Sequence, residues 1–263
     1  MGADFWIASE WWGTLFLVGA VAFPLTKRLF PHWWDQGYAF SKAVGMVLVP
    51  LIVFVLGTLH LLAFTKLSIV LALGIVFVLG IGLHVRRESP HFFAKHLLWE
   101  ELFFFFALLF WSWVKGHEPA IRGLEKFMDY GFMKSILDSR FFPPADMWYA
   151  GLPINYYYFG HLVVAVLTKL SGIDLAYTFN LMLASIFALT FTMSFSIGAQ
   201  LLRMREIGGI GGGLLTAFLV TLAGNMQTLY AFTRGYTGDH VKPFWELLWP
   251  WGEFFKRLPE GFA

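Results

Sequence analysis

Long apolar runs recur along the sequence and constrain its fold more than any other feature. A hydrocarbon core of about 30 Å requires roughly 20 apolar residues in helical form. The runs do not alternate between apolar and polar residues, so membrane-spanning strands are disfavoured. The sequence therefore predicts an all-α integral membrane protein with about seven transmembrane helices. The predicted spans are residues 7–26, 44–64, 67–85, 97–114, 155–170, 175–202 and 208–231.

The composition supports a polytopic membrane protein. The chain is 58% hydrophobic and 14% charged, whereas soluble domains contain about 25% charged residues. A net charge of +2 gives no reason to expect a nucleic-acid partner, and membrane lipids are the expected surroundings. The absence of cysteine excludes disulfides, thiol catalysis and cysteine-ligated metals. We treat residues 1–263 as a single membrane domain, in which 1–96 are N-terminal helices and 233–263 form an amphipathic interfacial tail.

The distribution of Lys and Arg between short connections predicts the orientation. Odd-numbered connections carry more of these residues, which places the N-terminus and the long loop outside the cytoplasmic (inner) membrane. Arg203 and Arg205 oppose this assignment. The odd connections contain Lys27, Arg28, Lys42, Arg86, Arg87, Lys95 and Lys169, and the even connections contain Lys66, Arg203 and Arg205.

Two carboxylates, Glu100 and Glu101, lie at the start of the predicted span 97–114. Carboxylates inside a span are costly and suggest a function. A helix N-terminus also favours negative charge, and Lys95 or His96 could pair with these residues. The sequence leaves a structural and a functional role open.

A glycine-rich run, IGGIGGGLL, opens the last predicted span. A phosphate-binding loop would need a preceding strand and a following Lys-Ser or Lys-Thr pair, and neither is present. Close helix packing or a flexible entry is the favoured interpretation.

The long polar stretch at residues 123–161 is where we look first for a site, because such excursions between spans often carry function. It overlaps an outer loop at 115–154. Apolar residues at spacings of three and four predict an amphipathic interfacial helix over 121–139. These residues are Leu124, Phe127, Met128, Phe132, Ile136 and Leu137.

The acidic residues Glu125 and Asp129 share one face of this predicted helix. Like charges at that spacing cost a few tenths of a kcal/mol, a penalty that a bound cation would reverse. Oxygen ligands at a membrane surface suit Mg²⁺ or Mn²⁺, with Lys126 and Arg122 holding a phosphate. The alternative is a solvated face on which Lys126 and Lys134 neutralise the acids.

Two prolines, Pro143 and Pro144, stiffen the following segment and are expected to hold Asp146 and Trp148 in a defined turn.

Asn155 and the triple tyrosine Tyr156, Tyr157 and Tyr158 then lead back into the membrane. Interfacial tyrosines are usually anchors. Three consecutive tyrosines on a helix point in three directions, so at least one should face the protein interior. His161 lies four residues after Tyr157 and is expected to share its face.

Several short motifs in this stretch occur in the order found in a known family. EKFMDYGFMKSIL, FFPPADMW and AGLPINYYYFGH resemble the signature of the YYY membrane protein family, which is uncharacterised and very hydrophobic. The resemblance covers roughly residues 97–229, and residues 97–232 form the core of the predicted domain. That family is grouped with the GT-C superfamily of membrane glycosyltransferases.

The resemblance implies glycosyl transfer from a polyprenyl-phosphate-linked sugar at the outer membrane face. It makes Asp129 or Glu125 the catalytic or metal-binding acid. Phe127 stands where the family usually has proline, and family members are usually longer. The alternative is therefore a non-catalytic accessory subunit of a larger membrane complex, derived from a GT-C-like ancestor and bound to other membrane subunits. The candidate donor- or cofactor-binding residues are Lys126, Arg122, Asp146, Asn155, Tyr156, Tyr157, Tyr158 and His161.

Overall fold

The computed structural model describes residues 2–82, 94–123, 125–204 and 208–224, together with two short strands. The chain forms two compact units, Met1–Ala217 and Phe218–Ala263. In the second unit, β1 (Tyr236–Thr237) pairs antiparallel with β2 (His240–Val241). The rest of the predicted interfacial tail lies outside the described residues.

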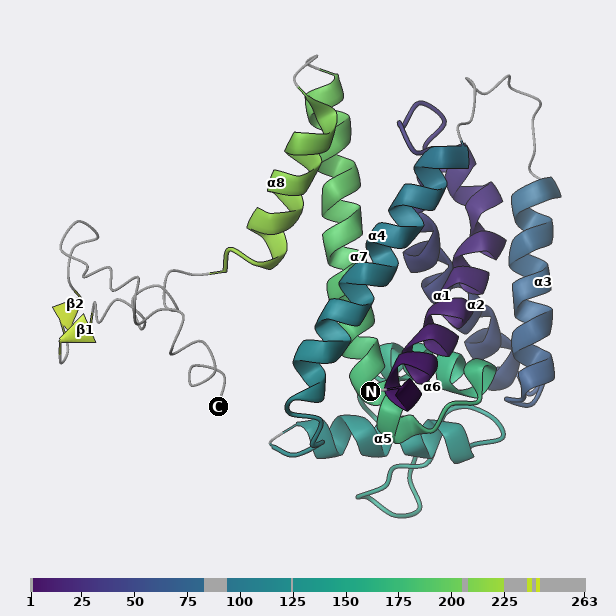
Figure 1. Ribbon diagram of the computed structural model, residues 1–263. Helices are drawn as coiled ribbons and strands as arrows, with labels where there is room; N and C mark the ends of the chain where they lie inside the picture. The colour runs from purple at the N-terminus through teal and green to yellow at the C-terminus, as the bar shows by residue number, and fades with distance from the viewer. Residues whose placement is uncertain are drawn as a thin grey trace. The chain divides into compact units, whose positions relative to one another are not determined.

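The first unit is built from helices (Figure 1). They are α1 (Gly2–Leu29), α2 (Tyr38–Thr58), α3 (Lys66–Gly82), α4 (Ala94–Gly116), α5 (Lys126–Asp138), α6 (Phe159–Ser171), α7 (Leu175–Arg203) and α8 (Gly209–Thr221), the last of which runs on into the second unit.

Four of these helices, α1, α2, α4 and α7, are long and apolar enough to cross a membrane. Three more, α3, α6 and α8, are apolar but shorter. The prediction of a helical membrane protein is thus confirmed, whereas the count of seven spans is not.

Close approach between helices depends on small residues. A Cβ atom placed on Gly45 of α2 would lie 2.6 Å from the carbonyl oxygen of Val18 on α1. On the opposing helix, a Cβ on Gly19 would lie 2.7 Å from the Lys42 side chain. Because neither glycine has a side chain, the two backbones can pack directly against each other.

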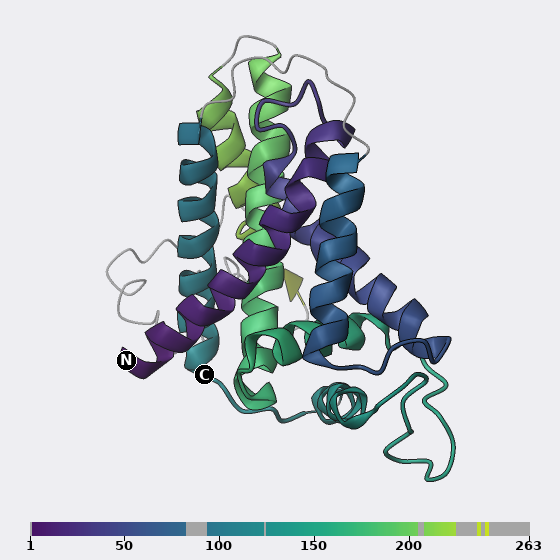
Figure 2. The same cartoon turned by 90° about the vertical axis from the view of Figure 1, so that its right-hand side faces the viewer.

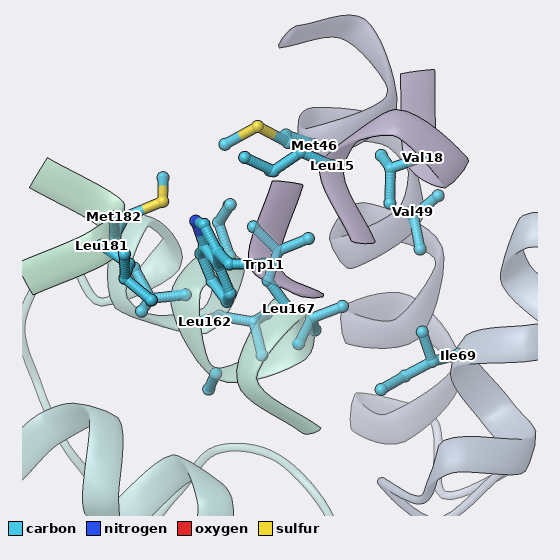
Figure 3. Close-up of a cluster of buried hydrophobic side chains, with 14 of the residues drawn as sticks. Trp11, Leu15, Val18, Met46, Val49, Ile69, Leu162, Leu167, Leu181 and Met182 are labelled. Carbon is cyan, nitrogen blue, oxygen red and sulfur yellow. The ribbon is translucent and has the colours of Figure 1, made fainter. Parts of the chain in front are cut away.

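The apolar core joins helices that are distant in the sequence (Figure 3). Trp11 is fully buried at its centre, and its indole N–H donates to Ser185 Oγ of α7 at 2.8 Å. This bond satisfies the polar end of a large buried side chain. Other members of this cluster come from α1, α2, α3, α6 and α7, and they include Leu15, Met46, Ile69, Leu162 and Met182.

The predicted span 155–170 corresponds to α6, which has 13 residues. At 1.5 Å per residue, such a helix reaches about 20 Å, short of the hydrocarbon thickness. Contacts with α5 occur near both of its ends: His161 contacts Asp129, and Lys169 Nζ donates to the carbonyl oxygen of Leu137 at 3.1 Å. The helix therefore lies along α5 at one end of the bundle (Figures 1 and 2).

The position of α6 changes which charges share an end of the bundle. Lys169 now belongs to the α5 end. Arg203, at the end of α7, belongs to the opposite end, because the connection between α1 and α2 contacts the last turns of α7 through Trp34. Lys27 and Arg28 lie in the last turn of α1 at that same end. Arg205 lies outside the described residues.

The glycine-rich run forms the start of α8 and packs closely against α7. A Cβ on Gly212 would lie 1.8 Å from Leu202, and one on Gly213 would lie 2.7 Å from Phe195. The close-packing interpretation of this run is confirmed.

Candidate functional site

The site predicted from sequence centres on α5, which lies across one end of the bundle. The helix begins at Lys126, not at residue 121, and is amphipathic as predicted. Its buried face consists of Phe132, Met133 and Ile136, and it packs mainly against α6. The opposite face leaves its polar side chains accessible. Leu124 lies outside the described residues.

Asp129 of α5 and His161 of α6 form the central contact of this site. The His161 Nε2 atom lies 3.0 Å from Asp129 Oδ1. Since a carboxylate only accepts hydrogen bonds, Nε2 carries the proton. The Asp129 side chain is 33% exposed and that of His161 only 13%. One oxygen of Asp129 is thus held from inside the protein while the side chain still reaches the surface.

The other side of the His161 ring faces apolar surroundings. Its Nδ1 atom is buried and has no hydrogen-bond partner in the described part of the chain. Phe132 packs against the ring in a T-shaped arrangement, with centroids 5.5 Å apart. The histidine therefore orients Asp129, and its second nitrogen does not reach solvent.

The triple tyrosine divides between the surface and the interior. The rings of Tyr156 and Tyr157 lie 3.9 Å apart, and the Tyr156 hydroxyl donates to that of Tyr157. Both residues are exposed, whereas Tyr158 is half-buried against Phe54, with ring centroids 6.2 Å apart. The expectation that one tyrosine faces the interior is confirmed, and burial raises the pKa of Tyr158.

Tyr156 lies next to the predicted acidic pair. Its pKa is raised to about 12, first by the hydrogen bond to Tyr157, then by desolvation and by nearby negative charges that include Glu125 and Asp129. Its ring also packs 5.8 Å from that of Phe132. The structure thus brings these acidic and aromatic candidates together on one surface.

Glu125 immediately precedes the first turn of α5 and is exposed, without a side-chain capping bond. Within the described ranges, no three His, Asp or Glu side chains are grouped closely enough to form a metal centre by themselves. Glu125 and Asp129 could supply two oxygen ligands to Mg²⁺ or Mn²⁺, and the rest would come from water or a phosphate.

Cations lie near the start of α5. The charges of Lys126 and Lys115, at the end of α4, interact with each other. Lys115 also lines a cavity of about 750 Å³, in which the buried Ser112 Oγ and Asn180 Oδ1 atoms lack partners among the described residues. Lys134, which the alternative assigned to neutralising the acids, instead pairs with Asp138 at 2.7 Å.

Asp146 has a structural role in the loop. Its carboxylate accepts hydrogen bonds from the backbone N–H groups of Trp148, at 2.8 Å, and Tyr149, at 3.0 Å, and these bonds lower its pKa. Asp146 therefore holds the predicted turn and does not join the acidic pair. Arg122 and Asn155 are exposed, and no side-chain contact with another described residue fixes them at the site.

A second polar cluster, inside the helical bundle, was missed by the sequence analysis. Glu101 accepts hydrogen bonds from Lys42, from the Tyr38 hydroxyl and from Trp12 Nε1, the last at 2.7 Å. The predicted partners of Glu101 were at positions 95 and 96, whose side chains lie outside the described residues. Sequence reasoning placed Lys42 in a connection. Glu100 and Glu101 within an apolar run could have indicated its true position, because buried acids need a cation inside the bundle.

Comparison with known proteins gives one family. The model of a family described as "Uncharacterized membrane protein (DUF2298)" matches residues 48–255, which include α5, α6 and the loop between them. No curated protein matches the chain, and no solved structure matches it. The family description names neither a reaction nor a donor. The match covers well over half of the sequence, and the chain therefore belongs to the DUF2298 family of uncharacterised membrane proteins.

Proposed function

We propose that this membrane protein transfers a sugar from a polyprenyl-phosphate donor, with Asp129 as the base that activates the acceptor hydroxyl. The observation that carries the proposal is the Asp129–His161 contact, which joins α5 and α6 at 3.0 Å. It fixes one carboxylate oxygen from inside and leaves an accessible side chain beside two exposed tyrosines. A general base needs this combination of fixed position and access to the reacting proton.

The proposed reaction uses few groups. The acceptor hydroxyl gives its proton to Asp129, and its oxygen forms a bond to the anomeric carbon of the sugar. The bond between that carbon and the donor phosphate oxygen breaks, and polyprenyl phosphate leaves with the electron pair. Lys126 and Lys115 would stabilise the negative charge on the phosphate, because their own charges lie close together.

The remaining candidates have supporting roles in this proposal. His161 is a positioning residue, because its Nε2 atom is engaged by Asp129 and its Nδ1 atom does not reach solvent. Mg²⁺ or Mn²⁺, held by Glu125 and Asp129, would add positive charge beside the donor phosphate. The adjacent, tilted rings of Tyr156 and Tyr157 offer an aromatic surface for a sugar ring.

We also propose that the chain crosses the inner membrane several times, with the site facing outside. Lys27, Arg28 and Arg203 lie at the end of the bundle opposite to α5. Counted over the short connections between described helices, that end carries these three positive residues and the α5 end carries Lys66 and Lys169. This difference supports a cytoplasmic location for the end opposite to α5.

The test is sugar transfer from a polyprenyl-phosphate donor in membranes that contain the full chain. Asp129→Asn should reduce transfer by at least about 100-fold, the usual contribution of a general base. Asp138→Asn is the matched control, because it lies on the same helix, is exposed and pairs with Lys134. The proposal fails if Asp129→Asn transfers sugar as fast as the control while both variants reach wild-type levels in the membrane.

A second candidate function is that of an accessory subunit bound to other membrane proteins. It is favoured by the loop between α5 and α6, which projects from the bundle (Figure 1) and exposes large parts of Trp148 and Tyr149. The test is co-purification from gently extracted membranes. A partner that co-purifies in fixed stoichiometry with the wild type and with Asp129→Asn, but not with Trp148→Ala, would support this role. A solitary active protein would exclude it.

A further inference from the structure

A second cavity lies within the first unit, at the end of the bundle opposite to the α5 site. Its volume is about 590 Å³, within the range of sites for small ligands. It lies between the α1–α2 connection, α4, α7 and the start of α8, and all of these segments reach it close to their ends. The walls are largely aromatic, contributed by Trp34, Trp99, Phe103 and Phe195.

The cavity contains one buried acid, Glu100, whose residue is only 6% exposed. Neither carboxylate oxygen has a hydrogen-bond partner among the residues that the structure describes. A buried carboxylate without a donor is costly, and such groups normally pair with a charge or bind an ion. Glu100 therefore points to a ligand that supplies positive charge.

The neighbouring acids do not share this need. Asp35 accepts hydrogen bonds from the backbone N–H groups of Gly37 and Ala39, at 2.8 and 3.1 Å, and from Ser196 Oγ at 2.9 Å. Glu101 has its three donors. Both acids and the Lys42 ammonium act electrostatically on Glu100. Within this described cluster, three carboxyl groups therefore surround one ammonium group. Glu100 also lies within hydrogen-bonding reach of the Asp35 carboxyl, so either a proton on Glu100 or a further cation balances the charge.

The two charged groups of the cavity have opposite signs. Arg203 lines it from the end of α7 and is exposed, whereas Glu100 is buried. Trp34 and Trp99 add aromatic faces, which attract ammonium groups. Apolar side chains, including Leu214 of α8, complete the lining. A complementary ligand has an ammonium group, a nearby anionic group and an apolar tail.

We propose that this cavity binds an amine-headed phospholipid of the phosphatidylethanolamine type, with its ammonium group on Glu100 and its phosphate on Arg203. The acyl chains follow the apolar wall toward Leu214. The site is separate from the proposed transfer site and does not depend on it, so Asp129→Asn should leave lipid binding unchanged.

The first test uses only the wild-type full chain in detergent, with lipid binding measured by native mass spectrometry. The probes are phosphatidylethanolamine, its N-acetylated form and phosphatidylglycerol, with identical acyl chains. We expect at least tenfold tighter binding of phosphatidylethanolamine than of the other two, equivalent to about 1.4 kcal/mol. Equal binding of phosphatidylethanolamine and its N-acetylated form overturns the proposal. Glu100 would then be neutralised by a proton and would not bind the ammonium group.

The second test identifies the residues. Glu100→Gln preserves the shape of the side chain and should abolish the preference for the free amine. Arg203→Gln should weaken the binding of all three phospholipids, because each carries the phosphate. Glu118→Gln is the matched control, since this exposed acid follows the opposite end of α4. An undiminished preference in Glu100→Gln contradicts the assignment. If Glu100→Gln does not fold, the comparison with the N-acetylated lipid still decides the result.

Discussion

The buried pair between Lys42 of α2 and Glu101 of α4 gives a quantitative test of the fold. Both side chains are less than a tenth exposed. Lys42→Met keeps the apolar stem and removes the ammonium group. Breaking a buried pair in this way typically costs about 3–5 kcal/mol. Because Tyr38 and Trp12 still donate to Glu101, we expect the lower end, about 3 kcal/mol, which is more than a hundredfold in the unfolding equilibrium constant.

The assay is unfolding in mixed detergent micelles with increasing dodecyl sulfate, followed by circular dichroism. Lys134→Met is the matched control, because it breaks an ion pair whose side chains are 59% and 62% exposed, and it should not measurably change stability. Replacing both Lys42 and Glu101 with Met should be less destabilising than the two single changes added together, since neither member of this pair is left alone. The reasoning is refuted if Lys42→Met unfolds at the same dodecyl sulfate concentration as Lys134→Met.

Three further predictions concern the α5 end of the bundle. Gly57→Ala would place a Cβ atom 2.5 Å from the buried Phe142 ring and should destabilise the protein by about 1–3 kcal/mol in the same unfolding assay; an unchanged midpoint would contradict this. Tyr157→Phe should lower the pKa of Tyr156 from about 12 toward its ordinary 10.0 in tyrosinate absorbance, because the hydrogen bond to Tyr157 is the largest cause of the increase. Since the pKa of Tyr156 is raised, the contribution of the Tyr156–Tyr157 hydrogen bond to folding stability is full below pH 10.0 and is lost as pH rises through about 12. An unaltered Tyr156 titration in Tyr157→Phe would argue against the contact. Asp146→Ala should speed proteolysis of the turn at pH 7. Since the pKa of Asp146 is lowered, its contribution is present above its ordinary 3.8 and is lost as pH falls through the lowered value; cleavage at the wild-type rate would count against this role.

The long apolar runs predicted most of the bundle because length alone identifies a helix that can cross a membrane. The span predicted at 175–202 is α7, observed at Leu175–Arg203, and that at 97–114 lies within α4. The prediction for α6 was less accurate for a physical reason. Leu162 and Leu167 are fully buried against other helices, and an apolar face that packs inside a protein has the same sequence pattern as one that faces lipid.

The sequence predicted which residues belong to the candidate site better than it predicted the contacts between them. Asp129, His161 and Tyr156 were named from their residue types and their place in the polar stretch. Their pairing depends on how residues 139–158 fold back over α5, and no helical spacing encodes that path. The same limit applies to Lys42 and Glu101, whose separation along the chain conceals their contact.

The placement of α6 has a consequence for compartments. A helix that lies along one end of the bundle does not change the side of the membrane, so Asp129 of α5 and His161 of α6 face the same compartment. Asp4 of α1 and Pro119, which follows α4, line one cavity, and the N-terminal end of α1 lies at the same end of the bundle as α5 (Figures 1 and 2). A tag placed before α1 and an impermeant reagent would therefore report which compartment Asp129 faces, without any change to the site.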